Sequence, residues 1–319
     1  MKTIIALIFT VYLASLFLHK DTHINGTSEH LKIAELPEGI AHMQQRIVGQ
    51  LSGKYALTNT VTLSSRWTPK ERVLTQDYLK AIIHQLGLQP ITHTYSYPNM
   101  NFGIDLLIEP FKGVNIYTVL PATVKSSEYI ILGAHYDSGK RNAPGAIDNA
   151  TGMALIYSVI KELQKVQHRK QHILMVFFDQ EEEENIGSKA FIKLIQQKKW
   201  NITSVHCFDM IGWDADNDDA MEIYTASKSL ENYYLKLADN LDKKILNITI
   251  NPINYNNSST DFDEFLKKDF NVIGAGECYY HRDTTPYKDT AKDTFETVNF
   301  SYLLSSSQFI TSIIKNLIN

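Results

Sequence analysis

Short apolar segments rich in β-branched and aromatic residues alternate with amphipathic segments along most of the chain, and this alternation limits the possible folds. The strand-like segments are 115–120, 129–132, 173–178, 205–208, 221–224 and 272–275. Apolar residues at helical spacing predict helices over 65–86, 152–163, 229–241 and 301–317. Buried strands that alternate with amphipathic helices indicate a sheet with helices on both faces. We therefore predict an α/β fold.

Composition adds three constraints. The chain has 319 residues, of which 44% are hydrophobic, and this suffices for one folded domain, which we place at 30–319. The net charge is -4 with both signs interspersed, so no basic stripe marks a nucleic-acid partner. The two cysteines, Cys207 and Cys278, lie far apart without CxxC spacing. They form either a disulfide or two buried thiols, and their apolar surroundings favour buried thiols.

The N-terminal residues differ from the rest of the chain. Lys2 precedes an uncharged segment at 4–18, and a polar stretch follows at 20–29. This is the layout of a signal peptide, which we place at 1–22, and it predicts an exported protein, secreted or periplasmic. The segment is shorter than the roughly 20 apolar residues of a membrane span, but no clear cleavage site follows it. An uncleaved membrane anchor formed by 4–18 is the alternative, and only then would the chain contact a membrane.

Three of the strand-like segments run directly into acidic residues. They end in Gly133-Ala-His135-Tyr-Asp137, in Asp179-Gln-Glu181-Glu182 and in Asp209. Ligand sites in α/β sheets lie at the carboxyl ends of strands, so these side chains should converge in one crevice. Unpaired carboxylates at such distances repel one another unless cations lie among them. The pattern therefore predicts a metal site.

Taken singly, each acid has a simpler interpretation. An acid after a strand commonly forms a turn or caps a helix, and Asp148 precedes the predicted helix at 152–163. The acidic run 181–184 is typical of a solvated surface. The combination favours the metal site, because four consecutive acids follow at once on an apolar strand, where uncompensated charge is costly.

The order and spacing of the motifs resemble the M28 family of zinc aminopeptidases. The motifs are His135-Tyr-Asp137-Ser, Pro144-Gly-Ala-Ile-Asp148-Asn-Ala-Thr-Gly152, Phe177-Phe-Asp-Gln-Glu181-Glu182, Phe208-Asp209-Met210, Ser259-Thr-Asp261 and Asp293-Thr294. The likeness extends over 113–298, more than half of the chain. It implies a three-layer α/β/α sandwich around a central mixed, mainly parallel sheet. It also implies two Zn²⁺ ions side by side.

The resemblance implies a ligand set for the two ions. His135 and Asp209 would hold one ion, Glu182 the other, and Asp148 would bridge both. Imidazole nitrogen and carboxylate oxygen are ordinary zinc ligands. Paired ions stabilise both the attacking water and the developing oxyanion.

Two further residues receive roles from the resemblance. Asp137 would accept the other ring N–H of His135 and fix its tautomer. Glu181 would not bind metal; as general base it would take the proton from the metal-bound water and pass it to the leaving amine.

The chain departs from the family pattern at the last ligand. The family has a histidine in a stretch resembling Pro-Tyr-Tyr-His-Thr-x-x-Asp-Thr, and this chain has Pro286-Tyr-Lys-Asp289-Thr-Ala-Lys-Asp-Thr294. Asp289 therefore stands in the place of the histidine, and carboxylate oxygen also ligates zinc. Its extra charge predicts a raised pKa of the bound water and a second position that favours a harder divalent ion such as manganese. His281 is an alternative ligand, although its spacing to the Asp-Thr pair is wrong.

The resemblance implies hydrolysis of the N-terminal residue from peptides by a monomeric enzyme. Met210, Tyr279 and Tyr280 are candidates to line the pocket for the substrate side chain. Three alternatives use the same scaffold: a one-zinc glutaminyl cyclase, a carboxypeptidase and a non-catalytic binding domain. Other hydrolase patterns do not occur, because the sequence has no Gly-x-Ser-x-Gly, His-Glu-x-x-His or phosphate-binding glycine-rich motif.

Overall fold

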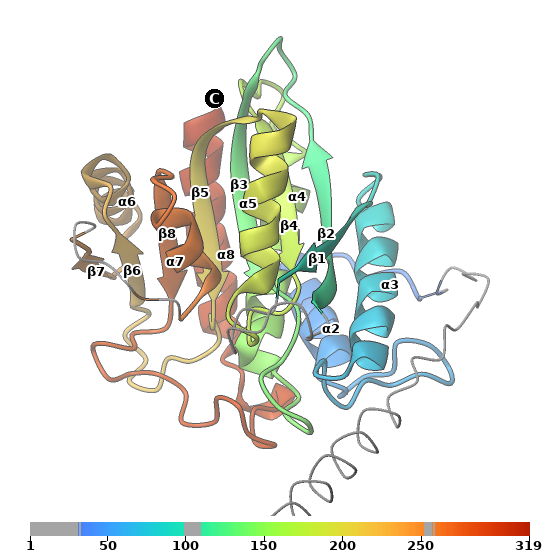
Figure 1. The fold of residues 1–319 in the computed structure, drawn as a ribbon. Coiled ribbons are helices and arrows are strands. Elements are labelled where there is room, and N and C mark those ends of the chain that lie inside the picture. The colour runs from blue at the N-terminus through green and yellow to red at the C-terminus, as the bar shows by residue number, and fades with distance from the viewer. Residues whose placement is uncertain (1–30, 32, 99–109, 252–256, 258) are drawn as a thin grey trace, which may run out of the picture. The chain divides into compact units, whose positions relative to one another are not determined.

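An eight-stranded mixed sheet forms the centre of the unit from Leu31 to Asn319 (Figure 1). The computed structural model describes residues 31, 33–98, 110–251, 257 and 259–319. The predicted signal or anchor segment and most of the asparagine-rich loop at 251–259 lie outside these residues. No helix within the described ranges is both long and apolar enough to cross a membrane.

The strand order is β1-β2-β4-β3-β5-β8-β6-β7. The strands are β1 Ile91–Tyr97, β2 Phe111–Leu120, β3 Glu128–His135, β4 His172–Phe178, β5 Asn201–Asp209, β6 Met221–Thr225, β7 Ile245–Thr249 and β8 Val272–Gly276. The centre of the sheet is parallel, since β3 pairs in this sense with β4 and β5, and β5 with β8. β6 and β7 are also parallel, whereas β1 with β2, β2 with β4 and β6 with β8 are antiparallel. The predicted mixed, mainly parallel sheet is confirmed.

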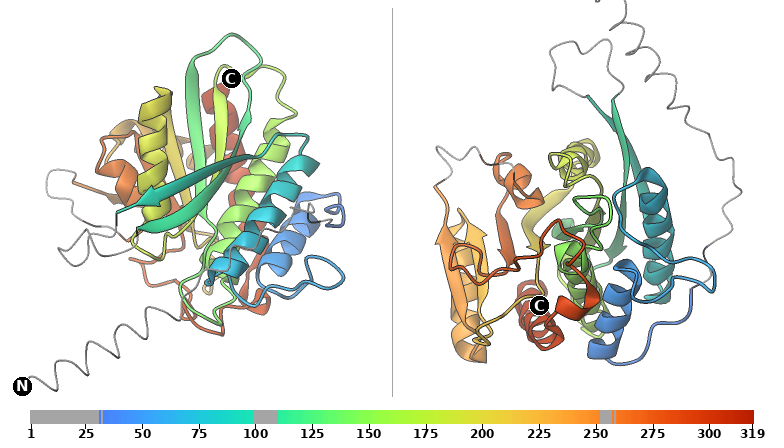
Figure 2. Two further views of the ribbon diagram at one scale, coloured as in Figure 1. Left: turned by 45° about the vertical axis from the view of Figure 1, so that its right-hand side comes forward. Right: turned by 90° about the horizontal axis from the view of Figure 1, so that it is seen from below.

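Helices cover both faces of the sheet (Figure 2). They are α2 Ile40–Leu51, α3 Pro69–Gln85, α4 Gly152–Leu163, α5 Ile186–Lys198, α6 Lys228–Leu241, α7 Asp261–Leu266 and α8 Phe300–Ile318. Buried side chains of α2, α3, α4, α6 and α8 share one apolar cluster, and those of α7 share a second with Phe191, Ile192 and Ile195 of α5. Ile173, Met175 and Phe177 of β4 belong to the first cluster, while Leu174, Val176 and Phe178 belong to the second. This alternation follows from the two-residue period of a strand and gives the predicted α/β/α sandwich.

The four helices predicted from apolar spacing all form, with ends set by local chemistry. The helix predicted at 65–86 begins at Pro69, because the Thr68 hydroxyl accepts a hydrogen bond from the Glu71 N–H and the Glu71 carboxylate accepts one from the Thr68 N–H. It ends before Gly87, whose φ of 69° suits a glycine. This helix is not the first main helix of the domain, because α2 precedes it.

The elements that the apolar pattern missed include both edge strands. β1 has one buried residue, Tyr95, and β7 has none. Edge strands lack a neighbour on one side and here face solvent, so they do not require a continuous apolar segment. Their pairing with β2 and β6 is a tertiary property.

Phe191 of α5 tests the packing on the α5 and α7 face. Its ring is fully buried, 5.5 Å from the centroid of Tyr117 and 5.8 Å from that of Phe178. Phe191→Ala should lower the free energy of unfolding by about 3–5 kcal/mol, because it leaves a cavity that the sheet cannot close. Urea denaturation measures the change. Val73→Ala on α3, where the side chain is 52% exposed, is the matched control and should change stability by less than about 0.5 kcal/mol.

Candidate metal centre

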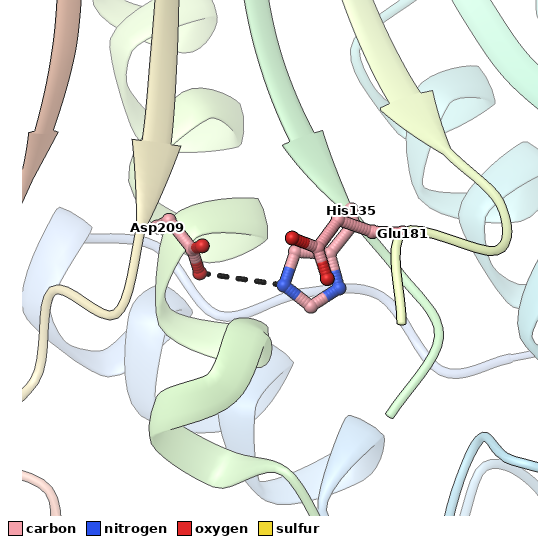
Figure 3. Close-up of side chains that lie close together, drawn as sticks. All are labelled: His135, Glu181 and Asp209. Carbon is pink, nitrogen blue, oxygen red and sulfur yellow. Dashed lines mark hydrogen bonds and ion pairs between the residues drawn. The ribbon is translucent and has the colours of Figure 1, made fainter. Parts of the chain in front are cut away.

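The carboxyl ends of β3, β4 and β5 bring His135, Glu181 and Asp209 together. His135 is the last residue of β3, Asp209 is the last of β5, and Glu181 follows β4 in the next turn. Figure 3 shows the three side chains pointing toward one another, with His135 Nε2 3.3 Å from Asp209 Oδ1. Their ligand atoms all lie within 4.8 Å of one another. The convergence predicted from the strand ends therefore occurs.

Asp148 and Glu182 join His135 in a second group. One ligand atom from each of these three residues lies within 4.8 Å of the others, and Asp148 Oδ1 is 3.0 Å from His135 Nε2. Asp148 is not a helix cap, because the Gly152 N–H donates to the Asn149 side chain at 3.0 Å. Neither oxygen of the buried Asp148 carboxylate accepts a hydrogen bond from a described residue. The groups that its oxygens face are instead the His135 imidazole and the Lys288 ammonium group, so the carboxylate is directed at positive charge or a metal-ligand nitrogen.

Asp293 holds the turn that carries Asp148. Its carboxylate accepts hydrogen bonds from the N–H groups of Ile147 at 2.8 Å and Asp148 at 3.0 Å. Burial raises the pKa of Asp293 to about 6, and the hydrogen bonds from these two N–H groups oppose this rise. Asp293 stands in a motif of the sequence, but its position as the support of Asp148 follows only from the fold.

The buried guanidinium of Arg66 ties together the segments around the site. It donates to the carbonyl oxygens of Leu51 at 2.9 Å, Tyr136 at 2.6 Å, Pro144 at 2.7 Å and Gly145 at 2.9 Å. Two of these segments lead directly to the candidate ligands. Arg66 belongs to no sequence motif, and the sequence around a single arginine does not indicate which carbonyl groups it will bind.

Asp137 supports the backbone of the site in addition to facing His135. Its carboxylate accepts hydrogen bonds from the N–H groups of Glu181 at 3.1 Å and Glu182 at 3.2 Å. Asp137 Oδ1 also lies 3.5 Å from His135 Nδ1, on the side where the predicted contact to the ring N–H would form. Asp137 therefore fixes the turn after β4, and it contacts the imidazole only at this longer distance.

The electrostatics of the cluster favour a bound cation. Burial raises the pKa of Glu181 well above its usual value and that of Glu182 to about 8, and neighbouring carboxylates add to both shifts. Burial likewise raises the pKa of Asp261 to about 7. Burial lowers the pKa of His135, but the charges of Glu181 and Asp209 outweigh it and leave that pKa well above normal. A cation among these groups would offset the repulsion between the ionised carboxylates.

Asp289 faces the same small space as Glu182. A Cβ atom on Gly139 would lie 1.8 Å from Asp289 Oδ1 and 2.9 Å from Glu182 Oε1, so glycine leaves this space open. Neither oxygen accepts a hydrogen bond within the described part of the chain. Two carboxylates thus converge where the sequence places the second ion.

Two lysines lie near carboxylates of the predicted second position. Lys288 Nζ is 3.4 Å from Asp148 Oδ2, and Lys140 Nζ is 3.9 Å from Asp289 Oδ2. The charge of Asp148 is the largest cause that raises the pKa of Lys288, against the effect of burial. No motif in the sequence predicts a role for Lys288.

His281 belongs to a separate cluster. Its Nδ1 pairs with buried Glu222, which also accepts hydrogen bonds from the Tyr280 N–H at 3.0 Å and from the Tyr224 hydroxyl. The side chain of His281 is 44% exposed and is absent from the groups of potential ligands among the described residues. In this structure His281 therefore contacts Glu222 rather than a candidate ligand, and its role as an alternative ligand stays a prediction.

A cavity of about 560 Å³ opens beside Asp209. The three predicted substrate contacts, Met210, Tyr279 and Tyr280, all line it. The two tyrosines are 63% and 60% exposed. Further lining residues, which the sequence did not indicate, are Tyr224, Ile248, Ile250, Phe262, Glu277 and Lys288. The cavity is thus largely apolar, with charged groups at the side nearest the metal centre.

Both cysteines are free and buried in this structure. Cys207 lies in β5 and also lines the cavity, while Cys278 follows β8. Burial raises the pKa of each thiol. The prediction of two buried thiols is confirmed.

Comparisons with known proteins place the chain in a family. The model of peptidase family M28 matches residues 115–313. A probable zinc metalloprotease of Pyrenophora teres f. teres is 35% identical over 113 residues, which are 31% of this chain and 23% of that protein. The chain thus spans only about a quarter of the length of that relative.

Solved structures show the same fold at lower identity. BSAP, a zinc aminopeptidase from Bacillus subtilis, has 13% identity and a TM-score of 0.72 over 90% of this chain and 97% of that one. A glutaminyl cyclase from Porphyromonas gingivalis has 15% identity and a TM-score of 0.65 over 87% of this chain and 98% of that one.

Arg66→Met should lower the free energy of unfolding by at least about 3 kcal/mol. The substitution keeps the apolar stem of the side chain but leaves several buried carbonyl oxygens without donors. Chemical denaturation followed by circular dichroism measures the loss. Arg141→Met, at an exposed position, should have little effect, and an equal loss in both variants would show that charge rather than hydrogen bonding is responsible.

Proposed function

Because the chain belongs to peptidase family M28, we propose that it is a zinc-dependent aminopeptidase that removes the N-terminal residue from peptides. One observation carries the proposal. His135, Asp148, Glu181 and Asp209 converge at the carboxyl ends of the central strands, directly beside a cavity that suits a side chain. The finer details of the reaction rest on the arrangement of these residues.

One zinc position is well supported by the donor atoms. His135, Asp148 and Asp209 would hold the ion, with one imidazole nitrogen and two carboxylate oxygens. This set leaves a position open for water or substrate, as catalytic zinc sites require. When bound, the ion supplies Lewis-acid polarisation of the scissile carbonyl and acidifies water.

Glu181 is proposed as the general base. Its carboxylate lies within 4.8 Å of the donor atoms of His135 and Asp209, and burial raises its pKa well above the usual value. A carboxyl group with a raised pKa accepts a proton from the attacking water more readily at neutral pH. Glu181 would then pass this proton to the amine that leaves. Asp137 positions Glu181 through the hydrogen bond to its N–H.

A second metal ion is the next part of the proposal. The sequence predicts a second ion held by Glu182, Asp148 and Asp289, and these carboxylates would suit a hard divalent ion such as manganese. Glu182 and Asp289 do converge next to Gly139. The ammonium group of Lys288 lies 3.4 Å from Asp148, one of these three carboxylates.

The proposed localisation and the proposed monomeric state rest on the sequence alone. The layout of 1–22 supports an exported enzyme, secreted or periplasmic, with an uncleaved anchor at 4–18 as the alternative. We propose a monomer whose partners are its peptide substrates.

Release of N-terminal residues from unblocked peptides by the zinc-loaded protein tests the activity. Glu181→Gln should lower kcat by about 10²- to 10⁴-fold, because the proton acceptor is lost. Its zinc content, measured by mass spectrometry, should stay unchanged. Glu184→Gln, in the same acidic run but exposed, is the matched control and should keep full activity.

The same assay separates the alternatives. Ring closure of peptides with N-terminal glutamine would indicate a cyclase, and release from the other end of the peptide would indicate a carboxypeptidase. Zinc binding without turnover of any peptide would favour a binding domain.

The cavity predicts a preference for large apolar N-terminal residues. Ile248, Ile250 and Phe262 offer apolar surface to a substrate side chain. We expect kcat/KM for peptides that begin with leucine or phenylalanine to exceed that for glycine by at least about tenfold. Equal rates across such a series would show that the cavity does not hold this side chain.

A further inference from the structure

The two oxygens of Asp148 face different cations. Oδ1 is 3.0 Å from His135 Nε2, on the side where the first zinc position lies. Oδ2 is 3.4 Å from Lys288 Nζ. In a centre with two ions, a bridging carboxylate offers one oxygen to each ion. Here the second oxygen already meets an ammonium group.

The remaining groups at the second position are poor competitors for zinc. Glu182 and Asp289 supply only carboxylate oxygens, and His281, the nearest histidine along the chain, pairs with Glu222 instead. Lys140 adds another ammonium group 3.9 Å from Asp289. A divalent ion placed here would be repelled by the positive charge of Lys288, and such repulsion is strong at separations near 4 Å in a partly buried site.

The backbone around Lys288 is anchored. The Tyr287 ring packs edge-on against Trp213 at a centroid distance of 5.8 Å, and the Tyr287 N–H donates to the Thr285 hydroxyl at 3.2 Å. On the other side, the Thr290 hydroxyl donates to the Tyr287 carbonyl at 2.7 Å. These contacts fix the local backbone on both sides of Lys288. The Lys288 side chain is 42% exposed and lines the cavity, and its ammonium group reaches Asp148.

We propose that Lys288 is the second cation of this centre, so that the chain binds a single zinc ion and the Lys288 ammonium group takes the place of another. The inference rests on the proposed zinc site of His135, Asp148 and Asp209. The Lys288 ammonium group lies within ion-pair distance of the Asp148 carboxylate, the group that would otherwise bridge two ions. Lys288 thereby compensates part of the buried negative charge without a metal.

Zinc stoichiometry tests the proposal independently of activity. Metal-free full-length protein is titrated with zinc in a calorimeter, and the zinc retained after desalting is measured by mass spectrometry. The wild type should bind one ion per chain. Lys288→Met, which keeps the length of the side chain but removes the charge, should bind two. The second ion should bind at least about 100-fold more tightly than in the wild type, because the repulsion is gone.

Two further variants sharpen the test. Lys292→Met removes the same charge from the same segment at an exposed position, and it should still bind one ion. Asp289→His should not admit a second ion while Lys288 is present, but together with Lys288→Met it should give a second site selective for zinc over manganese. Circular dichroism checks that each variant is folded, and Lys288→Gln replaces Lys288→Met if the latter is not.

The outcomes separate this inference from the proposed function. Two tightly bound zinc ions in the wild type, or one ion in folded Lys288→Met, would overturn the role of Lys288 and leave the peptidase proposal standing. A wild type that binds no zinc would overturn both. One ion in the wild type without release of N-terminal residues would overturn only the proposed reaction.

Discussion

Mutual repulsion among buried carboxylates is the constraint on which the centre of this protein depends. Asp148 and Glu181 are almost fully buried, and Glu182 and Asp209 lie beside them. A fold that gathers such groups needs compensating positive charge and rigid support. A zinc ion and the ammonium group of Lys288 would supply the charge.

The support comes from hydrogen bonds that act on the backbone rather than on the ligands. Asp137 holds the N–H groups of the turn after β4, Asp293 holds those of the turn before α4, and Arg66 binds carbonyl oxygens of the flanking segments. Each of the three is buried and polar, so its own partners must be satisfied within the fold. The side chains that face the centre can therefore keep free lone pairs.

The chain shares the scaffold of its family but differs from the family pattern at the second metal position. The match to peptidase family M28 covers the strands that carry the candidate ligands. The departure lies in one short segment, where Lys288 and Asp289 stand in place of the Tyr-His pair in the family pattern. A change from imidazole to carboxylate, together with a new ammonium group, alters both the donors and the charge at one position. The first position, at His135 and Asp209, is untouched by this change.

Strands, helices and the acids that follow the strands were determined by the sequence itself, because periodicity and composition are local properties. The segment 152–163 matches α4 residue for residue, and the strand ends located His135, Glu181 and Asp209. Edge strands and long-range partners were decided only by the tertiary structure. Lys288 meets Asp148 across a large separation in sequence, and no local pattern reports where a flexible lysine side chain will find its counter-charge.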